Sequence, residues 1–294
     1  MSDTTRTVDG HRIKLTSLDR VVYPSTGTTK RDVIDYFEAI APTLTRYTSD
    51  RAATRKRWMS GVGTAQDPGD SFFHKNLDDD APSWMRSYAI RHEDHTNRYP
   101  VLDDAASLVW FAQRGTLEFH VPQWRFRSGG GHEPPDRLVL DLDPGEGKGL
   151  TACIQVAHWA REVLESHDLP SIPVTSGSKG IHLYAPLDGS RDAEGANVLA
   201  HTIADQLADE HADLVTSNLR KDNRVGKVLV DWSQNNGSKT TVAPFSLRGR
   251  LRPTVATPRA WEELDEGLAQ VELEEALERA SAGLDPLAGL LRDV

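Results

Sequence analysis

Two aspartates two residues apart, Asp141 and Asp143, are the first candidates for chemistry in this sequence of 294 residues. They end a run, residues 138–143, in which leucines alternate with other residues as in a β-strand. Side chains two apart on a strand share a face, so both carboxylates would lie together where a Pro-Gly pair stops the strand. Like charges this close repel unless a cation lies between them, and divalent ions such as Mg²⁺ take oxygen ligands. The pattern indicates a metal site; the alternative is a strand end with two solvated aspartates.

A third carboxylate, Asp231, lies in a second alternating run, residues 227–233. The alternation predicts a strand with Asp231 on the face opposite Val228, Val230 and Trp232. Two strands would then bring three carboxylates to one place.

A Gly-rich turn, residues 176–180, lies between two further runs that are predicted to be strands. Ser176, Lys179 and the backbone N–H groups of the turn can present a hydroxyl, an ammonium and amides to a phosphate. His182 follows on the second strand, on the same face as Tyr184. The spacing is not that of a Walker A loop, and a plain hairpin turn is the alternative.

A helix is predicted to begin at Thr29, because Thr29 and Asp32 form a capping-box pair and apolar residues follow at helical spacing. Lys30 then lies in the first turn, where an ammonium and free backbone N–H groups would suit a phosphate. A solvated surface lysine is the alternative.

Aromatic and basic residues occur together at two further places. Phe72 and Phe73 precede Lys75, and in a strand one ring would enter the core while the other could stack on a nucleobase; two core rings are the alternative. Basic residues gather at 51–57, which include Lys56, and at 248–252, which begin with Arg248. His120, between two apolar residues, is by itself typical of a hydrogen-bonded core histidine.

The net charge of −10 is unevenly distributed. Residues 258–294 contain ten acidic residues against three arginines, so the rest of the chain is nearly balanced and a nucleic-acid groove remains possible. The single cysteine excludes an internal disulfide framework and a Cys-rich zinc site. No apolar run is long enough to span a membrane, and we expect a cytoplasmic protein.

The domain organisation follows from these patterns. We expect a disordered N-terminus (1–11), one catalytic domain (12–257) and an acidic helical segment (258–294) packed on the same domain. Residues 151–167 and 193–211 are predicted to be amphipathic helices, and residues 91–100 a polar, charged loop. Residues 108–111 and 117–121 are apolar enough for two core strands or for a helix followed by a strand.

Three strand-borne carboxylates, a Ser/Lys/His turn and a late arginine match the needs of nucleotidyl transfer by two metals. The sequence also resembles the polymerase domain of bacterial DNA ligase D, in the archaeo-eukaryotic primase superfamily. The resemblance rests on D-L-D-P-G (141–145), T-S-G-S-K-G-I-H-L-Y (175–184) and the block that starts V-D-W-S-Q-N-N (230–250). L-T-S-L-D-R (15–20), Y-P-S-T-G-T-T-K (23–30), T-R-K-R-W (54–58) and E-F-H-V-P-Q-W-R (118–125) extend it, in order, over about residues 12–258.

The resemblance implies an α/β (α+β) primase-polymerase fold, with two mixed or antiparallel sheets around the active-site cleft and helices outside. It implies a role for each candidate residue: Asp141, Asp143 and Asp231 as catalytic metal ligands; Lys56, His120, Ser176, Lys179, His182 and Arg248 at the incoming nucleotide; Arg20 and Lys30 at a DNA 5′-phosphate; and Phe72 and Phe73 against template bases. Ser17 and His74 depart from residues common in the family, Asn and an acidic residue, which affects end recognition rather than the triad.

The implied activity is that of an end-joining polymerase that fills gaps at DNA double-strand breaks. It would add NTPs, ribonucleotides in preference, to a primer 3′-OH with two divalent ions, Mn²⁺ or Mg²⁺, and recognise a downstream 5′-phosphate. The implied partners are DNA ends, NTP or dNTP, bacterial Ku and a DNA ligase, with no membrane, in a nucleoid-associated cytoplasmic setting.

Three alternatives remain open. A D-x-D glycosyltransferase would bind a metal and a nucleotide, but it would need neither Asp231 nor a DNA surface. A haloacid-dehalogenase-type phosphatase requires Thr or Val near the second aspartate, where this chain has Pro144 and Gly145. A non-catalytic module that bridges DNA ends would not require three clustered carboxylates.

Overall fold

Two β-sheets carry most of the candidate residues. The computed structural model describes residues 4–291. A six-stranded sheet has the order β13 (Val215–Thr216), β14 (Val228–Asp231), β10 (Arg137–Pro144), β12 (Ile181–Pro186), β11 (Ile172–Thr175) and β17 (Thr257–Pro258). A four-stranded sheet has the order β15 (Thr241–Val242), β9 (Thr116–Val121), β5 (Thr54–Arg57) and β6 (Phe72–His74). The first is mixed, because β13 and β14 are parallel, and the second is antiparallel.

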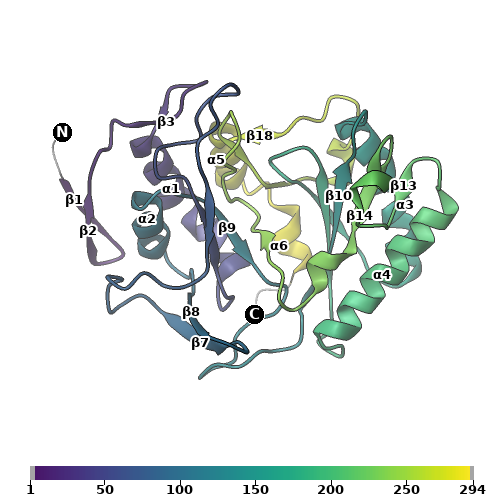
Figure 1. Cartoon of the computed structure of the whole chain (residues 1–294), viewed down its shortest axis with the longest axis horizontal. Coiled ribbons are helices and arrows are strands. Elements are labelled where there is room, and N and C mark those ends of the chain that lie inside the picture. Colours follow the sequence, from purple (N-terminus) through teal and green to yellow (C-terminus); the bar gives the residue numbers. More distant parts are fainter. Residues whose placement is uncertain (1–3, 292–294) are drawn as a thin grey trace.

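Helices cover the outer faces of the two sheets (Figure 1). The four-stranded sheet and helices α1 (Lys30–Thr48) and α2 (Ala105–Gln113) form one side of the molecule, and the six-stranded sheet with α3 (Leu150–Ser166) and α4 (Ala193–Glu210) forms the other. This arrangement confirms the predicted α+β class with two sheets flanked by helices. None of the described helices is long and apolar enough to cross a membrane.

Strand β10 separates two hydrophobic clusters. Leu138, Leu140 and Leu142 point into the cluster beneath α3 and α4, whereas Val139 joins the cluster on the opposite face. The predicted alternation is therefore confirmed, although the strand continues through Pro144. Because Asp141 and Asp143 share the parity of Val139, they lie on the face toward the four-stranded sheet.

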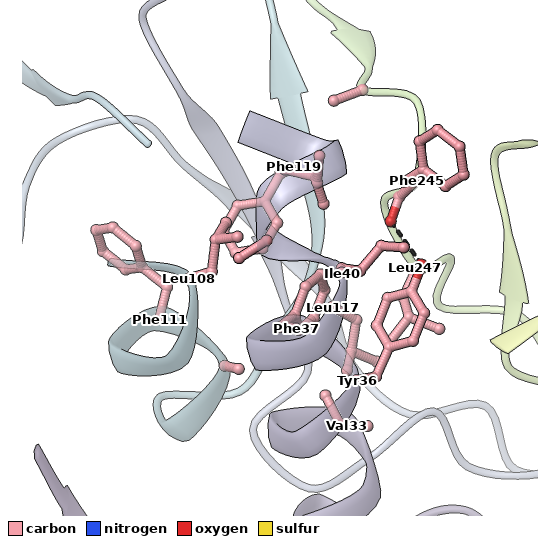
Figure 2. Close-up of a cluster of buried hydrophobic side chains, with 14 of the residues drawn as sticks. Val33, Tyr36, Phe37, Ile40, Leu108, Phe111, Leu117, Phe119, Phe245 and Leu247 are labelled. Atoms are coloured by element: carbon pink, nitrogen blue, oxygen red, sulfur yellow. Dashed lines mark hydrogen bonds between the residues drawn. The ribbon is translucent and has the colours of Figure 1, made fainter. Parts of the chain in front are cut away.

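Helix α1 begins where the sequence predicts. Thr29 Oγ1 accepts from Asp32 N at 3.3 Å and Thr29 N donates to Asp32 Oδ2 at 2.7 Å, which completes the capping box. The helix buries Val33 and Phe37 against α2 and β9, and the Phe37 and Phe119 rings meet edge to face with centroids 5.0 Å apart (Figure 2). Each fully buried side chain of this size stabilises the fold by roughly 1.5–3 kcal/mol.

A strained turn joins this cluster to the segment that carries Arg248. Phe245 is fully buried and has a positive φ of 64°, which is rare for a residue with a side chain. Its carbonyl accepts from Tyr36 Oη at 2.8 Å (Figure 2), and its N–H donates to Ala256 O at 2.6 Å. These two hydrogen bonds hold the backbone three residues before Arg248.

The prediction of a disordered N-terminus is wrong for residues 4–11. Strand β1 (Thr4–Val8) pairs with β2 (His11–Leu15) through a turn at Asp9 and Gly10, both with positive φ. Asp-Gly is a strong hairpin signal, and the Val8 side chain is buried in the core. The prediction of disorder relied on the polar composition and did not take these two features into account. Residues 1–3 lie outside the described part of the chain.

The prediction of a loop at residues 91–100 is also largely wrong. Strand β7 (Ser87–Arg91) pairs with β8 (Thr96–Pro100), and only residues 92–95 form the turn. The hairpin lies over a small cluster that contains Tyr99 and Trp124, so one face is apolar while the other is charged. Polar residues outnumber apolar ones in this segment, so the alternation of apolar and polar side chains along the two strands was not recognised in the sequence.

The described part of residues 258–294 packs on the body of the molecule. It contains helices α5 (Leu273–Ser281) and α6 (Pro286–Leu290), a short 3₁₀ turn η3 (Trp261–Glu263), and β18 (Val271–Glu272), which pairs with β16 (Thr254–Val255). Ala276 and Leu287 are fully buried in the cluster that α1 also contributes to, and Tyr47 Oη donates to Asp285 at 2.7 Å. The segment is thus partly helical, with a strand that composition did not predict.

Four short elements complete the described chain. Strands β3 (Val21–Tyr23) and β4 (Thr28–Thr29) form a two-stranded sheet just before α1. The 3₁₀ turns η1 (Lys221–Arg224) and η2 (Trp232–Asn235) flank β14, so that strand ends at Asp231 and not at residue 233 as predicted.

Candidate active site

The three aspartates converge on the central strands of the six-stranded sheet. Asp141 pairs in register with Asp231 across β10–β14 and with His182 across β10–β12. His182 Nε2 lies 3.5 Å from Asp141 Oδ1. Asp143 follows two residues along β10 on the same face, and its side chain is exposed at the strand end. The sequence therefore located the carboxylates and the histidine correctly relative to one another.

The carboxylates repel one another. Burial, Asp143 and Asp231 raise the pKa of Asp141 well above its usual range. Partial loss of hydration within the folded site, together with Asp231, raises the pKa of Asp143. A bound cation would favour the charged forms and offset this repulsion. The charge density and the oxygen-only donors fit a hard divalent ion such as Mg²⁺ or Mn²⁺.

The site is not a complete metal cage formed by the protein alone. Within residues 4–291, no group of three or more His, Cys, Asp or Glu side chains has the geometry to enclose one metal. Magnesium in nucleotide enzymes is typically held by one or two carboxylates, with substrate phosphates and waters completing the octahedron. The aspartates fit that shared mode of binding.

Asp231 is oriented by residues to which the sequence analysis gave no role. Asp231 Oδ1 accepts from Ser233 N at 2.9 Å and from Ser233 Oγ, and Oδ2 accepts from Gln234 Nε2 at 3.1 Å. Lys239 Nζ in turn donates to Ser233 Oγ. The polar run after Asp231 was the available signal, since such residues often turn back to cap a strand end.

Asn235 replaces a missing strand partner beside the site. Strand β14 ends at Asp231, opposite Asp141, so it cannot pair with Val139 further along β10. The Asn235 side chain accepts from Val139 N at 2.8 Å and donates to Val139 O at 2.7 Å. A carboxamide reproduces both hydrogen bonds of a peptide group, so the backbone of β10 is satisfied two residues before Asp141.

The Gly-rich turn joins β11 to β12 as predicted. Ser176 is buried and its Oγ accepts from Ser178 N and Gly180 N, both at 3.2 Å, while Lys179 is exposed. Gly177 has a φ of +64°, and a Cβ there would lie 2.6 Å from Arg248 Cγ. Arg248 Nη1 donates to Ser176 O. The close approach allowed by glycine therefore brings Arg248 beside the turn that carries Lys179.

Glu118 is a buried residue of this site that the sequence analysis missed. Its Oε1 accepts from Gly249 N at 2.9 Å and lies 3.4 Å from Arg248 Nε, and its Oε2 accepts from His120 Nε2 at 2.8 Å. Burial would raise the pKa of Glu118, but Arg248 and His120 outweigh burial and hold it well below its usual range. Glu118 is two residues from His120 on β9, so strand parity was the available signal.

His182 and His120 are neutral at neutral pH. Burial, Arg248 and His120 lower the pKa of His182 to about 3, and burial lowers the pKa of His120 despite Glu118. His182 Nδ1 is buried, and no hydrogen-bond partner for it exists among the described residues. It can therefore hydrogen-bond to a ligand without carrying charge.

Both phenylalanines of β6 are exposed, 46% for Phe72 and 57% for Phe73. Strand alternation allowed one ring to enter the core, but neither ring does, and β6 is an edge strand of its sheet. Arg57 stacks over Phe72, whereas Lys56 Nζ lies 5.3 Å from the Phe73 ring, which meets His120 edge to face. Two exposed rings beside cations form a surface on which nucleobases can stack.

Arg20 and Lys30 lie together at a second location. Lys30 is only 5% exposed, its backbone N–H donates to Arg20 O at 2.8 Å, and its Nζ donates to Thr16 O at 2.9 Å. Burial and Arg20 lower the pKa of Lys30 to about 8. The alternative of a solvated surface lysine is thus excluded.

A cavity of about 590 Å³ lies next to Lys239. Lys239, which reaches Asp231 through Ser233, lines it together with Thr54, the β5 residue paired with His120. The remaining wall comes from the β7–β8 hairpin, Lys75 and Trp124. The three aspartates and the two β6 phenylalanines do not line this cavity, so Lys239 is its link to the carboxylates.

Comparison with known proteins identifies the class. The family model of the LigD primase-polymerase domain matches residues 29–287. The solved polymerase domain of Mycobacterium tuberculosis ligase D in complex with DNA has a TM-score of 0.89 and 47% identity, over 95% of this chain and 98% of that chain. Such a fold and site define a nucleotidyltransferase-type enzyme. The chain belongs to the LigD primase-polymerase domain family.

The curated relatives are longer proteins. The multifunctional non-homologous end joining protein LigD of Mycolicibacterium smegmatis is 46% identical over 283 residues, which are 96% of this chain and 36% of that protein. The bifunctional LigD of Bacillus subtilis is 31% identical over 258 residues, 87% of this chain and 40% of that protein. The chain thus spans well under half the length of these relatives. Family membership removes the glycosyltransferase and phosphatase alternatives.

Proposed function

We propose that this chain is an end-joining polymerase that fills gaps at DNA double-strand breaks by adding nucleotides to a primer 3′-OH. The observation that carries the proposal is the register of Asp141 with Asp231, which brings three carboxylates to one face next to the Gly-rich turn. The names of the curated relatives place them in non-homologous end joining, and the similar solved domain is complexed with DNA.

Asp141, Asp143 and Asp231 would hold two divalent ions, Mg²⁺ or Mn²⁺. When bound, such ions activate the attacking 3′-hydroxyl and neutralise the triphosphate and the leaving pyrophosphate. Ser233 and Gln234 fix the carboxylate of Asp231 by the hydrogen bonds described above, and Lys239 balances part of its charge. The oxygen ligands would therefore be oriented before the nucleotide arrives.

The incoming triphosphate would lie along the Gly-rich turn. Lys179 and Arg248 supply the positive charge, and Ser176 keeps the turn in shape. His182, neutral and with Nδ1 unpaired, would hydrogen-bond to the nucleotide, while Lys56 and His120 complete the opposite wall. Glu118 acts as a positioning residue for Arg248 and His120.

DNA would be recognised at two places. Phe72 and Phe73 would pack against template bases, because their exposed rings adjoin Lys56 and Arg57. Arg20 and Lys30 would hold the 5′-phosphate across the gap, and the partly desolvated ammonium of Lys30 would interact strongly with that charge. DNA ends of the nucleoid, bacterial Ku and a DNA ligase would be the partners, and ribonucleotides the preferred substrates.

The test is primer extension on a gapped duplex, with rNTPs or dNTPs and with Mn²⁺ or Mg²⁺. We expect the wild type to extend the primer and Asp141→Ala to lose extension while it still binds the gap. Asp209→Ala, an exposed carboxylate on α4, is the matched control and should extend normally. A wild type that binds the gap without extending it would favour a DNA-end-bridging module instead, and one that does neither would overturn the proposal.

A further inference from the structure

A second cluster of basic residues surrounds a cavity at the opposite end of β10 from Asp143. The cavity has a volume of about 220 Å³ and lies where the end of α1, the start of β10 and α6 meet. Arginines dominate its polar lining, against a single carboxylate, Asp50. The basic lining residues are Arg46, Arg51, Arg125 and Arg137. We call this cavity the arginine pocket.

The carboxylates near the arginine pocket are already engaged. Asp136 accepts from Arg51 Nη2 at 2.5 Å and from Arg125 Nε at 2.8 Å. Asp50, the carboxylate of the lining, accepts from Arg86 Nη2 at 2.5 Å. Asp285 accepts from the hydroxyl of Tyr47. None of them accepts a hydrogen bond from Arg137, although Asp136 attracts its charge.

Arg137 is 1% exposed, and its strongest hydrogen bonds go to neutral groups. Its Nε donates to Gln123 Oε1 at 2.7 Å and its Nη1 to Tyr47 O at 3.5 Å. Its Nη2 is buried and has no hydrogen-bond partner among the described residues, and the same holds for Arg51 Nε. A buried guanidinium with unused donors is costly unless something accepts from it.

The guanidinium groups also repel one another. Burial and Arg137 lower the pKa of Arg51 to about 9, and burial lowers the pKa of Arg137. Such shifts mean that the charged forms lack full compensation in this pocket. An anion of suitable shape would supply the missing acceptor and the missing charge together.

We propose that the arginine pocket binds a phosphate-type oxyanion at a site separate from the nucleotidyl-transfer site. Planar guanidinium forks match the oxygens of a phosphate through paired N–H donors, which a tetrahedral anion can accept on several faces. The anion has two possible sources of the same chemistry: free phosphate or pyrophosphate, or the terminal phosphate of a nucleic-acid strand. Arg46, exposed at the rim, would be the first group that the anion meets.

The position of binding can be tested directly. Crystals soaked in tungstate should show anomalous density beside Arg137 and Arg125. Lys179→Ala, which weakens the Gly-rich turn on another part of the sheet, should leave this density in place. Density at the turn alone, or no density within hydrogen-bond distance of Arg137, would overturn the proposal.

Binding in solution should follow the same residues. Titration calorimetry with inorganic phosphate and with pyrophosphate uses the Lys179→Ala, Lys30→Met background, which weakens the two phosphate sites proposed above. It should show a site that is weakened at least about tenfold by Arg46→Gln combined with Arg125→Gln. Arg46 is exposed and Arg125 is partly exposed, and the ion pair between Arg51 and Asp136 remains in this variant. The fold should therefore be retained, and circular dichroism checks this. Arg161→Gln, an exposed arginine on α3 paired with Glu165, is the matched control. Equal affinity in all variants would overturn the proposal.

The source of the anion is distinguished by competition. If a 5′-phosphorylated oligonucleotide displaces inorganic phosphate from this site and the 5′-hydroxyl form does not, the site takes a strand end. If neither displaces it, the site takes the free anion. Both outcomes support the oxyanion site, whereas saturation by acetate with no response to phosphate contradicts it.

Discussion

Asp141 and Asp231 lie opposite each other in register across β10–β14, and this pairing places two partly buried acids at directly facing backbone positions. Burial and its two carboxylate neighbours raise the pKa of Asp141. At neutral pH the cation-free fold therefore contains an electrostatic penalty at the very residues proposed to bind metal. Removing one of these carboxylates should therefore lower the activity and raise the stability of the metal-free protein.

Asp141→Asn should lose nucleotide addition by about a thousandfold while making the metal-free protein more stable by about 1 kcal/mol. The amide removes one of three mutually repelling charges but cannot replace a carboxylate ligand. Urea unfolding in EDTA at pH 7 measures the stability, and gapped-duplex extension measures activity. Asp209→Asn should change neither, and a metal-free Asp141→Asn protein less stable than wild type would contradict this account.

Glu118→Gln should raise the KM for the incoming nucleotide by about tenfold with a smaller effect on kcat. The carboxylate holds Arg248 and His120 from one side, so its loss would let the arginine move away from the Gly-rich turn. The free energy of unfolding should also fall, by about 3 kcal/mol, because Arg248 would lose its only carboxylate partner among the described residues.

Asp78→Asn separates the two effects of Glu118. Asp78 pairs with Arg55 and Arg57 on β5, so its loss should destabilise the fold without moving Arg248. Steady-state kinetics on both variants give the comparison. A nucleotide KM raised equally in both would mean that Glu118 acts through general stability alone.

The sequence predicted the central strands because their signals are local. Alternation fixed the faces of β10 and β14, and side-chain parity then placed Asp141, Asp143 and Asp231 together. The capping box of Thr29 and Asp32 is equally local and predicted the start of α1.

What the sequence did not predict depends on contacts between distant residues. The parity of β9 places Glu118 on the same face as His120, but its contacts with Arg248 and Gly249 come from a segment far along the chain. Whether Phe72 and Phe73 are buried depends on β6 being an edge strand, which is a property of the sheet and not of the dipeptide. The β7–β8 hairpin was not predicted because most of its residues are polar. Its few apolar side chains are buried only by residues from other segments, such as Trp124, and the local sequence does not show this contact.

The preference for a downstream 5′-phosphate should weaken as pH rises through about 8, the pKa of Lys30. Burial and Arg20 lower this pKa, so the ammonium is charged below that pH and is lost above it, whereas the terminal phosphate keeps its charge from pH 7 to 9. The measurement is the ratio of extension rates on 5′-phosphate and 5′-hydroxyl gaps across this range.

The same ratio, measured on a Lys30 variant, tests whether Lys30 is the group that titrates. Lys30→Met should reduce the ratio at pH 7 and make it independent of pH, since no titrating ammonium remains. Using a ratio cancels any pH effect on the chemical step, which both substrates share. A wild-type ratio that stays constant up to pH 9 would exclude Lys30 as the phosphate-binding group.

Asp136 should control stability at low pH. Burial would raise its pKa, but Arg51 and Arg137 outweigh burial and hold the pKa at about 2. A carboxylate with a lowered folded-state pKa stabilises the fold fully above its unfolded value near 4, and the contribution, about 2 kcal/mol, is lost as pH falls through about 2. Urea unfolding between pH 6 and pH 2.5 should therefore show a steeper loss for wild type and Asp209→Asn than for Asp136→Asn. Identical pH slopes for wild type and Asp136→Asn would mean that the arginines around the pocket do not depend on this carboxylate.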